Sequence, residues 1–360
     1  IRNCKKELVS MLKSYAKKDD CKASIHVGVL EKNPHTECGM LPKSKKLLNH
    51  LPVVNAGSWN ALITSYAHDG QAEDALHCFE LMQNEGLSPN MITFTCILKA
   101  CGNAGAIDKG KQIHDEILNM GFLGKDIAIG TSLVDLYAKC GQFIKAQQVL
   151  EELPFRDVVT WNVLIKECAQ RGHGHEALHC FERMKIGGFS PDIVTFICIL
   201  KACGSIGAVE KGKQIHDEIV SRGFLKRDVI LCIALVDMYI KFCLLAKAQD
   251  VLQELPVQNA VCSGVETLVS TVKACGRVGA IDKGKQIHDE IVRCGLQKKN
   301  DVALSNALID MYLKCGKPVR AQEVLHEVPF HDIGSWNVLI AGYVRQGQGE
   351  EALGCFQQIR

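Results

Sequence analysis

One eight-residue sequence, GKQIHDEI, occurs three times in this chain, at 110–117, 212–219 and 284–291. Around the first two copies, long stretches match position by position at an offset of 102 residues; CILKACG at 96–102 returns at 198–204. Self-similarity at a fixed period is the signature of a repeat array. In such an array each repeat buries its apolar face only against its neighbours, so the chain is expected to form a row of similar units.

The 102-residue period divides into three repeats of 35, 36 and 31 residues. They cover 56–90, 91–126 and 127–157, and the order restarts at 158–192, 193–228 and 229–259. Each repeat carries two apolar stripes at helical spacing, separated by a break that contains glycine. No segment alternates apolar and polar residues with period two over a useful length, so we expect an all-α fold of helix-turn-helix repeats without a sheet.

The array is irregular toward both ends. Residues 1–55 match parts of the 36- and 31-residue repeats, and are interpreted as degenerate N-terminal repeats. Residues 260–264 stand where a 35-residue repeat is expected, so we interpret them as its remnant. Residues 265–360 resume the order and stop inside the second helix of a 35-residue repeat, as if more chain once followed.

Composition narrows the classes of function. The formal net charge is +2, so contact with a nucleic acid would depend on a local basic stripe. No apolar run reaches the length of a membrane span, so no membrane partner is expected. The 18 cysteines contain no C-x-x-C pair and recur at fixed repeat positions, which favours small buried thiols in a reducing compartment. The first residue is Ile1, so a targeting peptide, if there was one, is not visible.

One catalytic motif needs weighing. His-Asp-Glu inside the octapeptide, at 114–116, 216–218 and 288–290, matches the H-x-E of zinc-dependent cytidine deaminases. That zinc site also requires a C-x-x-C pair, and three copies inside a structural repeat favour helix packing. No phosphate-binding glycine loop or nucleophile elbow occurs. We therefore predict no catalysis, no metal site and no cofactor.

The repeats resemble the pentatricopeptide repeat family. The stretch VVTWNVLI at 158–165, then EAL at 176–178 and GFSPD at 188–192, is similar to its repeat pattern. The 35/36/31 order resembles the plant PLS subclass. LKAC at 200–203 with the following octapeptide resembles an L repeat, and LIDMYLKCG at 308–316 resembles an S repeat. Tetratricopeptide repeats have a uniform 34-residue period and a W-x2-L-G-x2-Y pattern, and neither is present.

The resemblance implies a right-handed superhelical α-solenoid that binds single-stranded RNA in a mitochondrion or chloroplast, with one repeat facing one base. The PLS subclass is associated with the choice of C-to-U RNA editing sites. An editing deaminase or accessory protein acting in trans would then supply the chemistry.

The family's base-choosing positions are the fifth and the last residue of each repeat. Carried over to this chain, the pairs are Asn60 with Asn90, Thr95 with Asp126, Thr131 with Asp157, Asn162 with Asp192, and Asn306 with Asp332, while Asn337 lacks a partner. Three repeats instead carry Ile197, Ile233 and Val269 at the fifth position, where an aliphatic side chain can neither donate nor accept. The pairs imply the target 5′-C-(G)-G-U-n-n-n-U-3′. The alternative is that these Asn and Asp residues only cap helices.

Two further sets of residues follow from the register. Val159, Val194 and Ile230 occupy the second position, where the family sandwiches bases, although core packing explains them equally well. Position 13 of successive repeats carries candidate phosphate contacts, Lys139, Lys241, Arg277, Lys314 and Arg345. A cation near a helix C-terminus also complements the helix dipole, so a solvated helix end is the alternative.

Two other functions stay open. Concave helical arrays bind proteins readily, and the aliphatic fifth positions and near-neutral charge fit such a scaffold. The damaged repeats also fit a decayed paralogue that keeps the fold but only weak RNA affinity.

Overall fold

The computed structural model describes residues 55–296, 301–327 and 333–358, and within them it contains α-helices and no strand. This confirms the predicted all-α fold of helix-turn-helix repeats. None of the described helices combines the length and apolar character that crossing a membrane requires. The degenerate repeats expected at 1–55 lie outside the described residues, except for Asn55.

The chain divides into two compact units, the N-terminal block (1–168) and the C-terminal block (169–360). Helices of the first block are α4 (Ala56–His68), α5 (Ala72–Asn84), α6 (Met91–Ala104), α7 (Ile107–Asn119), α8 (Ile127–Lys139), α9 (Phe143–Glu152) and nearly all of α10 (Val158–Gln170). Helices of the second block are α11 (Gly174–Ile186), α12 (Ile193–Ile206), α13 (Val209–Ser221), α14 (Val229–Lys241), α15 (Leu245–Glu254), α16 (Val257–Cys262), α17 (Val265–Val278), α18 (Ile281–Arg293), α19 (Val302–Lys314), α20 (Pro318–Glu327), α21 (Ile333–Arg345) and α22 (Gly349–Gln358).

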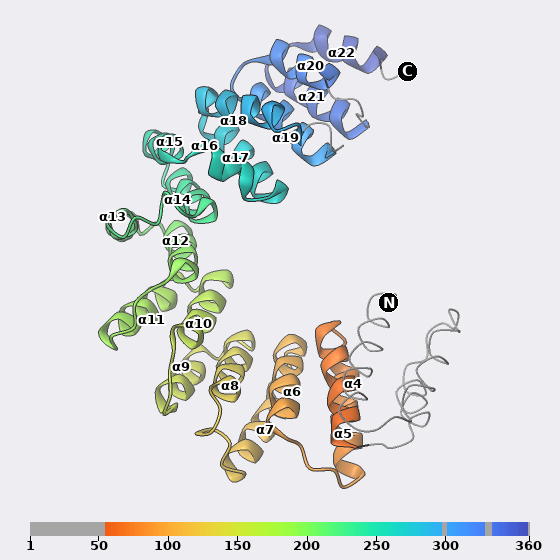
Figure 1. Ribbon diagram of the computed structural model, residues 1–360, viewed down its shortest axis with the longest axis vertical. Helices are drawn as coiled ribbons and strands as arrows, with labels where there is room; N and C mark the ends of the chain where they lie inside the picture. Colours follow the sequence, from red (N-terminus) through yellow and green to blue (C-terminus); the bar gives the residue numbers. More distant parts are fainter. Residues whose placement is uncertain (1–54, 297–300, 328–332, 359–360) are drawn as a thin grey trace, which may run out of the picture. The chain divides into compact units, whose positions relative to one another are not determined.

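Within each block the first helices of successive hairpins lie side by side (Figure 1). Helices α4, α6 and α8 form one such row, and α12, α14, α17, α19 and α21 form the other. The second helix packs back onto its first helix and onto the next hairpin, as α5 packs on α4 and α6, and α18 packs on α17 and α19. The apolar stripes read from the sequence point into these contacts; Phe94 and Phe196, for example, are completely buried. The first helices therefore provide one continuous row of equivalent positions in each block.

The glycine of the octapeptide is required by a close approach between helices. A Cβ atom on Gly110 would lie 2.6 Å from a methyl carbon of Leu136, and one on Gly212 would lie 2.7 Å from the Met238 sulfur. Gly284 meets Met311 in the same way, at 2.7 Å. Each glycine thus lets the second helix of one repeat press against the first helix of the next.

The octapeptide histidine packs in the same interface. The distance from histidine Nδ1 to a tyrosine hydroxyl is 2.9 Å for His114 and Tyr137, 2.7 Å for His216 and Tyr239, and 2.9 Å for His288 and Tyr312. Burial lowers the pKa of all three histidines below the ordinary value, so the neutral imidazole is favoured. These contacts confirm the packing interpretation of the His-Asp-Glu tripeptide.

The recurring cysteines are mostly core residues. Cys78, Cys101, Cys180, Cys203, Cys275 and Cys355 are buried, as predicted. Burial raises the pKa of Cys101 and Cys275 to about 12 and that of Cys203 to about 11, so these thiols stay protonated. The prediction is wrong for Cys140 and Cys315, which are half-buried because each lies at the C-cap of a first helix.

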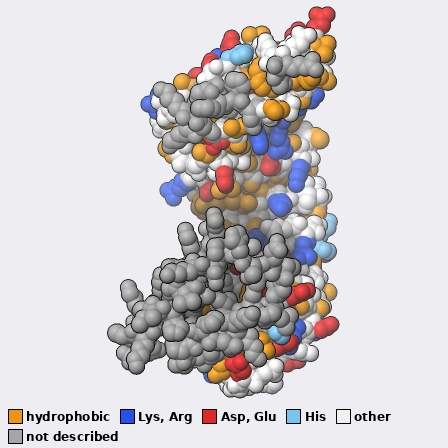
Figure 2. Space-filling model, turned by 90° about the vertical axis from the view of Figure 1, so that its right-hand side faces the viewer, with side chains coloured by type: hydrophobic (Ala, Val, Ile, Leu, Met, Phe, Trp, Pro, Cys, Tyr) orange, Lys and Arg blue, Asp and Glu red, His pale blue; other side chains and the backbone are white. Residues whose placement is uncertain are grey.

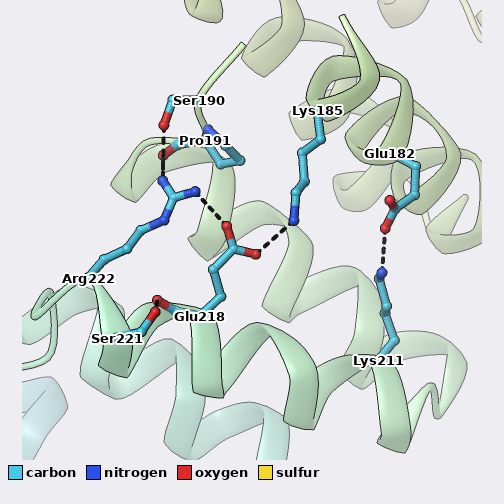
Figure 3. A network of polar contacts seen from close by, with 8 residues as sticks. All are labelled: Glu182, Lys185, Ser190, Pro191, Lys211, Glu218, Ser221 and Arg222. Atoms are coloured by element: carbon cyan, nitrogen blue, oxygen red, sulfur yellow. Dashed lines mark hydrogen bonds and ion pairs between the residues drawn. The ribbon is translucent and has the colours of Figure 1, made fainter. Parts of the chain in front are cut away.

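Ion pairs join the second helices of neighbouring repeats in the C-terminal block (Figure 3). Lys211 of α13 pairs with Glu182 of α11, and Lys185 of α11 pairs with Glu218 of α13 at 2.9 Å. Arg222 then binds Glu218 at 2.6 Å and donates to the Pro191 carbonyl at 3.0 Å. In the N-terminal block Lys109 and Glu80 repeat the first of these pairs at 3.0 Å.

The third copy of this lysine has a different partner. Lys283 is buried and donates to the carbonyl oxygens of Gln253 at 3.2 Å and Leu255 at 2.5 Å, at the end of α15. No 35-residue repeat precedes its hairpin, so no equivalent of Glu80 or Glu182 is present. The short helix α16 stands at this place instead, and α17 packs directly on α14. The row of first helices therefore continues through the irregular segment.

Candidate nucleic-acid interface

The fifth and last residues of the repeat 56–90 come together. Asn60 Nδ2 donates to Asn90 Oδ1 at 3.2 Å, so the two predicted partners contact each other. The Thr93 hydroxyl lies between them and donates to Asn60 Oδ1 at 2.5 Å. Asn60 is only 4% exposed, whereas Asn90 is exposed. The last residue therefore presents a polar group to solvent, and the buried fifth residue holds it in place through a hydrogen bond.

The repeat 127–157 has a related arrangement with different residues. The hydroxyls of Thr131 and Thr160 lie 2.9 Å apart, and Thr160 Oγ1 lies 2.8 Å from Asp157 Oδ1. Thr131 also donates to the carbonyl of Ile127 at 2.9 Å. Sequence reasoning predicted Thr131 and Asp157 but missed Thr160, which joins them.

The other predicted pairs are less complete. Thr95 donates to the carbonyl of Met91 at 2.8 Å, and Asp126 accepts from the backbone N–H of Ala128 at 2.8 Å. Within the described part of the chain, these two side chains therefore bind backbone groups and not each other. Asn162 is 8% exposed in the N-terminal block, whereas Asp192 belongs to the C-terminal block and is exposed.

Toward the end of the chain the pairs are only partly visible. Asn306 Oδ1 is buried without a hydrogen-bond partner among the described residues, and Asp332 lies outside them. Asn337 is exposed, in contrast to the two buried asparagines at the same position, Asn60 and Asn162.

The last residues do cap helices, but each capping bond uses only one polar atom of the side chain. Asn90, Asp157 and Asp192 each accept, through Oδ1, the backbone N–H of a threonine three residues later. Asp126 caps α8 in a similar way. Asn90 therefore keeps its NH2 group, and Asp157 its second carboxylate oxygen, for a ligand.

Side chains at the second position lie in solvent. Val159 is 59% exposed, Val194 49% and Ile230 54%, so the core-packing explanation is wrong for these residues. Ile92, also 54% exposed, holds the same position in the repeat 91–126 and was missed by sequence reasoning. The repeat register alone could have identified it. Exposed aliphatic side chains next to the polar pairs offer surfaces against which flat rings can pack.

Most of the candidate phosphate contacts already have acidic partners. Lys139 binds Asp135 at 2.8 Å, Arg277 binds Asp237 at 2.5 Å, and Asp310 binds both Lys314 at 2.5 Å and Arg345 at 3.3 Å. Lys241 is exposed and makes no ion pair with the described residues. On the face drawn in Figure 2, basic side chains are accordingly interspersed with acidic ones.

Comparison with known proteins agrees with this architecture. The model of the PPR repeat family matches residues 54–103 and 156–224. The PPR repeat model matches 92–122, 131–158, 304–332 and 334–360. Among solved structures, the pentatricopeptide repeat protein PPR10 in complex with an 18-nt psaJ RNA element is similar in fold. The TM-score is 0.53 at 20% identity, over 89% of this chain and 52% of that one.

Curated relatives extend the match along the chain. Pentatricopeptide repeat-containing protein At4g38010 of Arabidopsis thaliana is 32% identical over 342 residues, covering 85% of this chain. Protein At4g18520 of the same plant, described as chloroplastic, is 32% identical over 353 residues, covering 89%. The chain spans 59% and 56% of the lengths of these two relatives. Together with the family models, these matches show that the chain belongs to the pentatricopeptide repeat family.

Proposed function

We propose that this chain binds single-stranded RNA and selects its sequence through the fifth and last residues of its repeats. The observation that carries the proposal is the direct contact between Asn60 and Asn90, which holds one polar group of a capping side chain at the surface. The exposed aliphatic residues of the second position stand next to such pairs in the repeat. PPR10, a protein of similar fold, forms a complex with an 18-nt RNA element, and this supports the same class of ligand here.

The chemistry of the last residue supports the proposed base preferences. Asn90 uses Oδ1 for capping and retains its Nδ2 donor, which suits the N3 acceptor of cytosine. Asp157 uses Oδ1 in the same way and retains Oδ2, an acceptor that suits the N1–H of guanine or the N3–H of uracil. The repeats 56–90 and 127–157 are thereby assigned to C and G. Asn162 with Asp192 and Asn306 with Asp332 are assigned to U.

The finer role follows the resemblance to the PLS subclass. The chain would act in a mitochondrion or chloroplast as the recognition factor of a C-to-U RNA editing site, and a deaminase or accessory protein would supply the chemistry in trans. Relatives described as chloroplastic support an organellar site of action. The chain's own residues would bind and position the RNA.

The first test is binding to a short RNA that contains 5′-C-G-G-U-n-n-n-U-3′. We expect tighter binding to this RNA than to a scrambled RNA, because each well-formed pair to a base edge discriminates by about 1–3 kcal/mol. We also expect tighter binding than to DNA of the same sequence, because DNA lacks the 2′-hydroxyl groups by which proteins distinguish RNA. Titration at two salt concentrations would measure it. Equal affinity for target and scramble would reject the sequence-selective function and favour a protein-binding scaffold or a decayed paralogue.

Lys241, which has no acidic partner among the described residues, gives a second prediction. Replacing it by alanine should reduce the slope of log Kd against log salt by about 1, because a phosphate contact releases one counterion. The matched control is Lys139→Ala, which removes a lysine already held by Asp135 and should change the slope less. If both variants change the slope equally, ion pairing within the protein does not decide which lysines reach the RNA.

A further inference from the structure

Each well-formed base-selecting pair rests on a third side chain from the following repeat. In the repeat 56–90 this is Thr93, whose hydroxyl lies 2.5 Å from Asn60 Oδ1 and 3.1 Å from Asn90 Oδ1. It also accepts the backbone N–H of Asn90 at 3.1 Å. The hydroxyl has a single proton, which goes to the nearer acceptor, Asn60 Oδ1, while the backbone N–H of Thr93 donates to Asn90 Oδ1 at 3.0 Å. Thr93 thereby fixes which way both amides face, and therefore which group of Asn90 points outward.

Thr93 is the third residue of its repeat, and the third residue of the repeat 158–192, Thr160, contacts the pair of the repeat 127–157 in the same way. The Thr160 hydroxyl lies 2.9 Å from the Thr131 hydroxyl. Both this hydroxyl and the backbone N–H of Thr160 lie 2.8 Å from Asp157 Oδ1. Thr93 and Thr160 are both completely buried. Since neither has surface to offer a ligand, any influence on RNA must pass through the residues that they hold.

In the repeats that follow the 36-residue repeats, the third residue is aliphatic and not threonine. There it is Ile129, Leu231 or Leu304, each with an exposed fraction of at most 2%. An aliphatic side chain cannot bridge two polar groups. Thr95, the one polar fifth residue in these repeats, accordingly donates to a carbonyl of its own helix, while Asp126 accepts from the backbone of α8.

We propose that Thr93 and Thr160 are positioning residues for base selection, and that the aliphatic residues after the 36-residue repeats leave the pairs there without a fixed orientation. This inference rests on the proposed RNA-binding function. It predicts which repeats discriminate between bases and which bind RNA without discrimination. The capping contact alone, which all these repeats keep, does not make that distinction.

The test replaces Thr93 by valine, which keeps the shape but removes the hydroxyl, and by serine, which keeps the hydroxyl. Affinities are measured in the full chain for four RNAs that differ only at the nucleotide assigned to the repeat 56–90. We expect Thr93→Val to reduce the preference for C by about tenfold and Thr93→Ser to retain most of it. Preferences at the other nucleotides should not change.

The matched control is Thr267→Val, the same substitution in the first turn of α17, after a repeat whose fifth residue is Ile233. It should leave all base preferences unchanged. A Thr93→Val protein that keeps its preference for C, or loses affinity for all four bases alike, overturns the positioning role. Should Thr93→Val not fold, Thr160→Val tested at the nucleotide assigned to 127–157 gives the same decision. A wild-type chain without base preference would overturn the proposed function itself.

Discussion

Replacing Gly276 by alanine is expected to lower the free energy of unfolding by about 1–2 kcal/mol. Gly276 lies buried in α17, where a Cβ atom would be 2.9 Å from the Cα of Met311 in α19. The contact is with backbone, so a rotamer change cannot relieve it and one helix must move. Overpacking of a close contact typically costs about 1–3 kcal/mol, from which the better helix propensity of alanine subtracts up to about 1 kcal/mol.

Urea unfolding of the two proteins would measure this difference. The matched control is Gly354→Ala, an exposed glycine inside α22 with no atom within 4 Å of the added methyl group. Without a clash only the helix propensity changes, so this variant should be more stable by about 0.5–1 kcal/mol. The opposite signs of two identical substitutions would separate packing from propensity. Equal stabilisation by both would mean that α17 and α19 do not approach as closely as described.

Replacing Asn90 by aspartate should change the base preferred by the repeat 56–90 from C to U. The new side chain can cap α6 through one oxygen, as Asp192 caps α12, and presents an acceptor where Asn90 presents a donor. The cytosine pairing is then lost and a pairing to uracil N3–H is gained. The lost pairing and the gained pairing each contribute about 1–3 kcal/mol, so the ratio of the affinities for C and U should shift by about 30-fold or more.

The fold should tolerate this change, because aspartate is as good an N-cap as asparagine and its charge is favourable at a helix N-terminus. Affinities for RNAs with C or U at the assigned nucleotide would measure the switch. The matched control, Asn119→Asp, adds the same charge at an exposed residue of α7 away from the pair. It should lower the affinities for both RNAs slightly and equally. The same result for Asn90→Asp would exclude Asn90 from base selection.

Much of the architecture was predictable because successive repeats carry similar apolar spacing, and most also carry a glycine-containing break, so the copies predict the same helical hairpin. The octapeptide and its surroundings indicated helical hairpins at a fixed period, and the glycine-containing breaks separated the helices. The positions of Asn60, Asn90, Thr131 and Asp157 in their repeats were also predictable, since they depend only on counting residues along a regular array.

The roles of individual residues depended on contacts between repeats. Val159 and Val194 are as apolar as core residues, and only the packed structure places them in solvent. The ion pairs of Arg277 with Asp237 and of Arg345 with Asp310 likewise join side chains from different helices, so their proximity depends on how those helices pack. Lys139, by contrast, pairs with Asp135 four residues earlier in its own helix, a contact that follows from helical spacing alone.

By itself the sequence determined the repeat period, the helical hairpins and the family, because these follow from residue type and spacing along the chain. Tertiary structure alone decided that Thr93 and Thr160 bridge the predicted pairs of the preceding repeat. It also decided that Lys283 binds the end of α15 where an acidic partner is missing. Hydrogen bonds between repeats need atoms within about 3 Å of each other, and only the stacking of one hairpin on the next sets such distances.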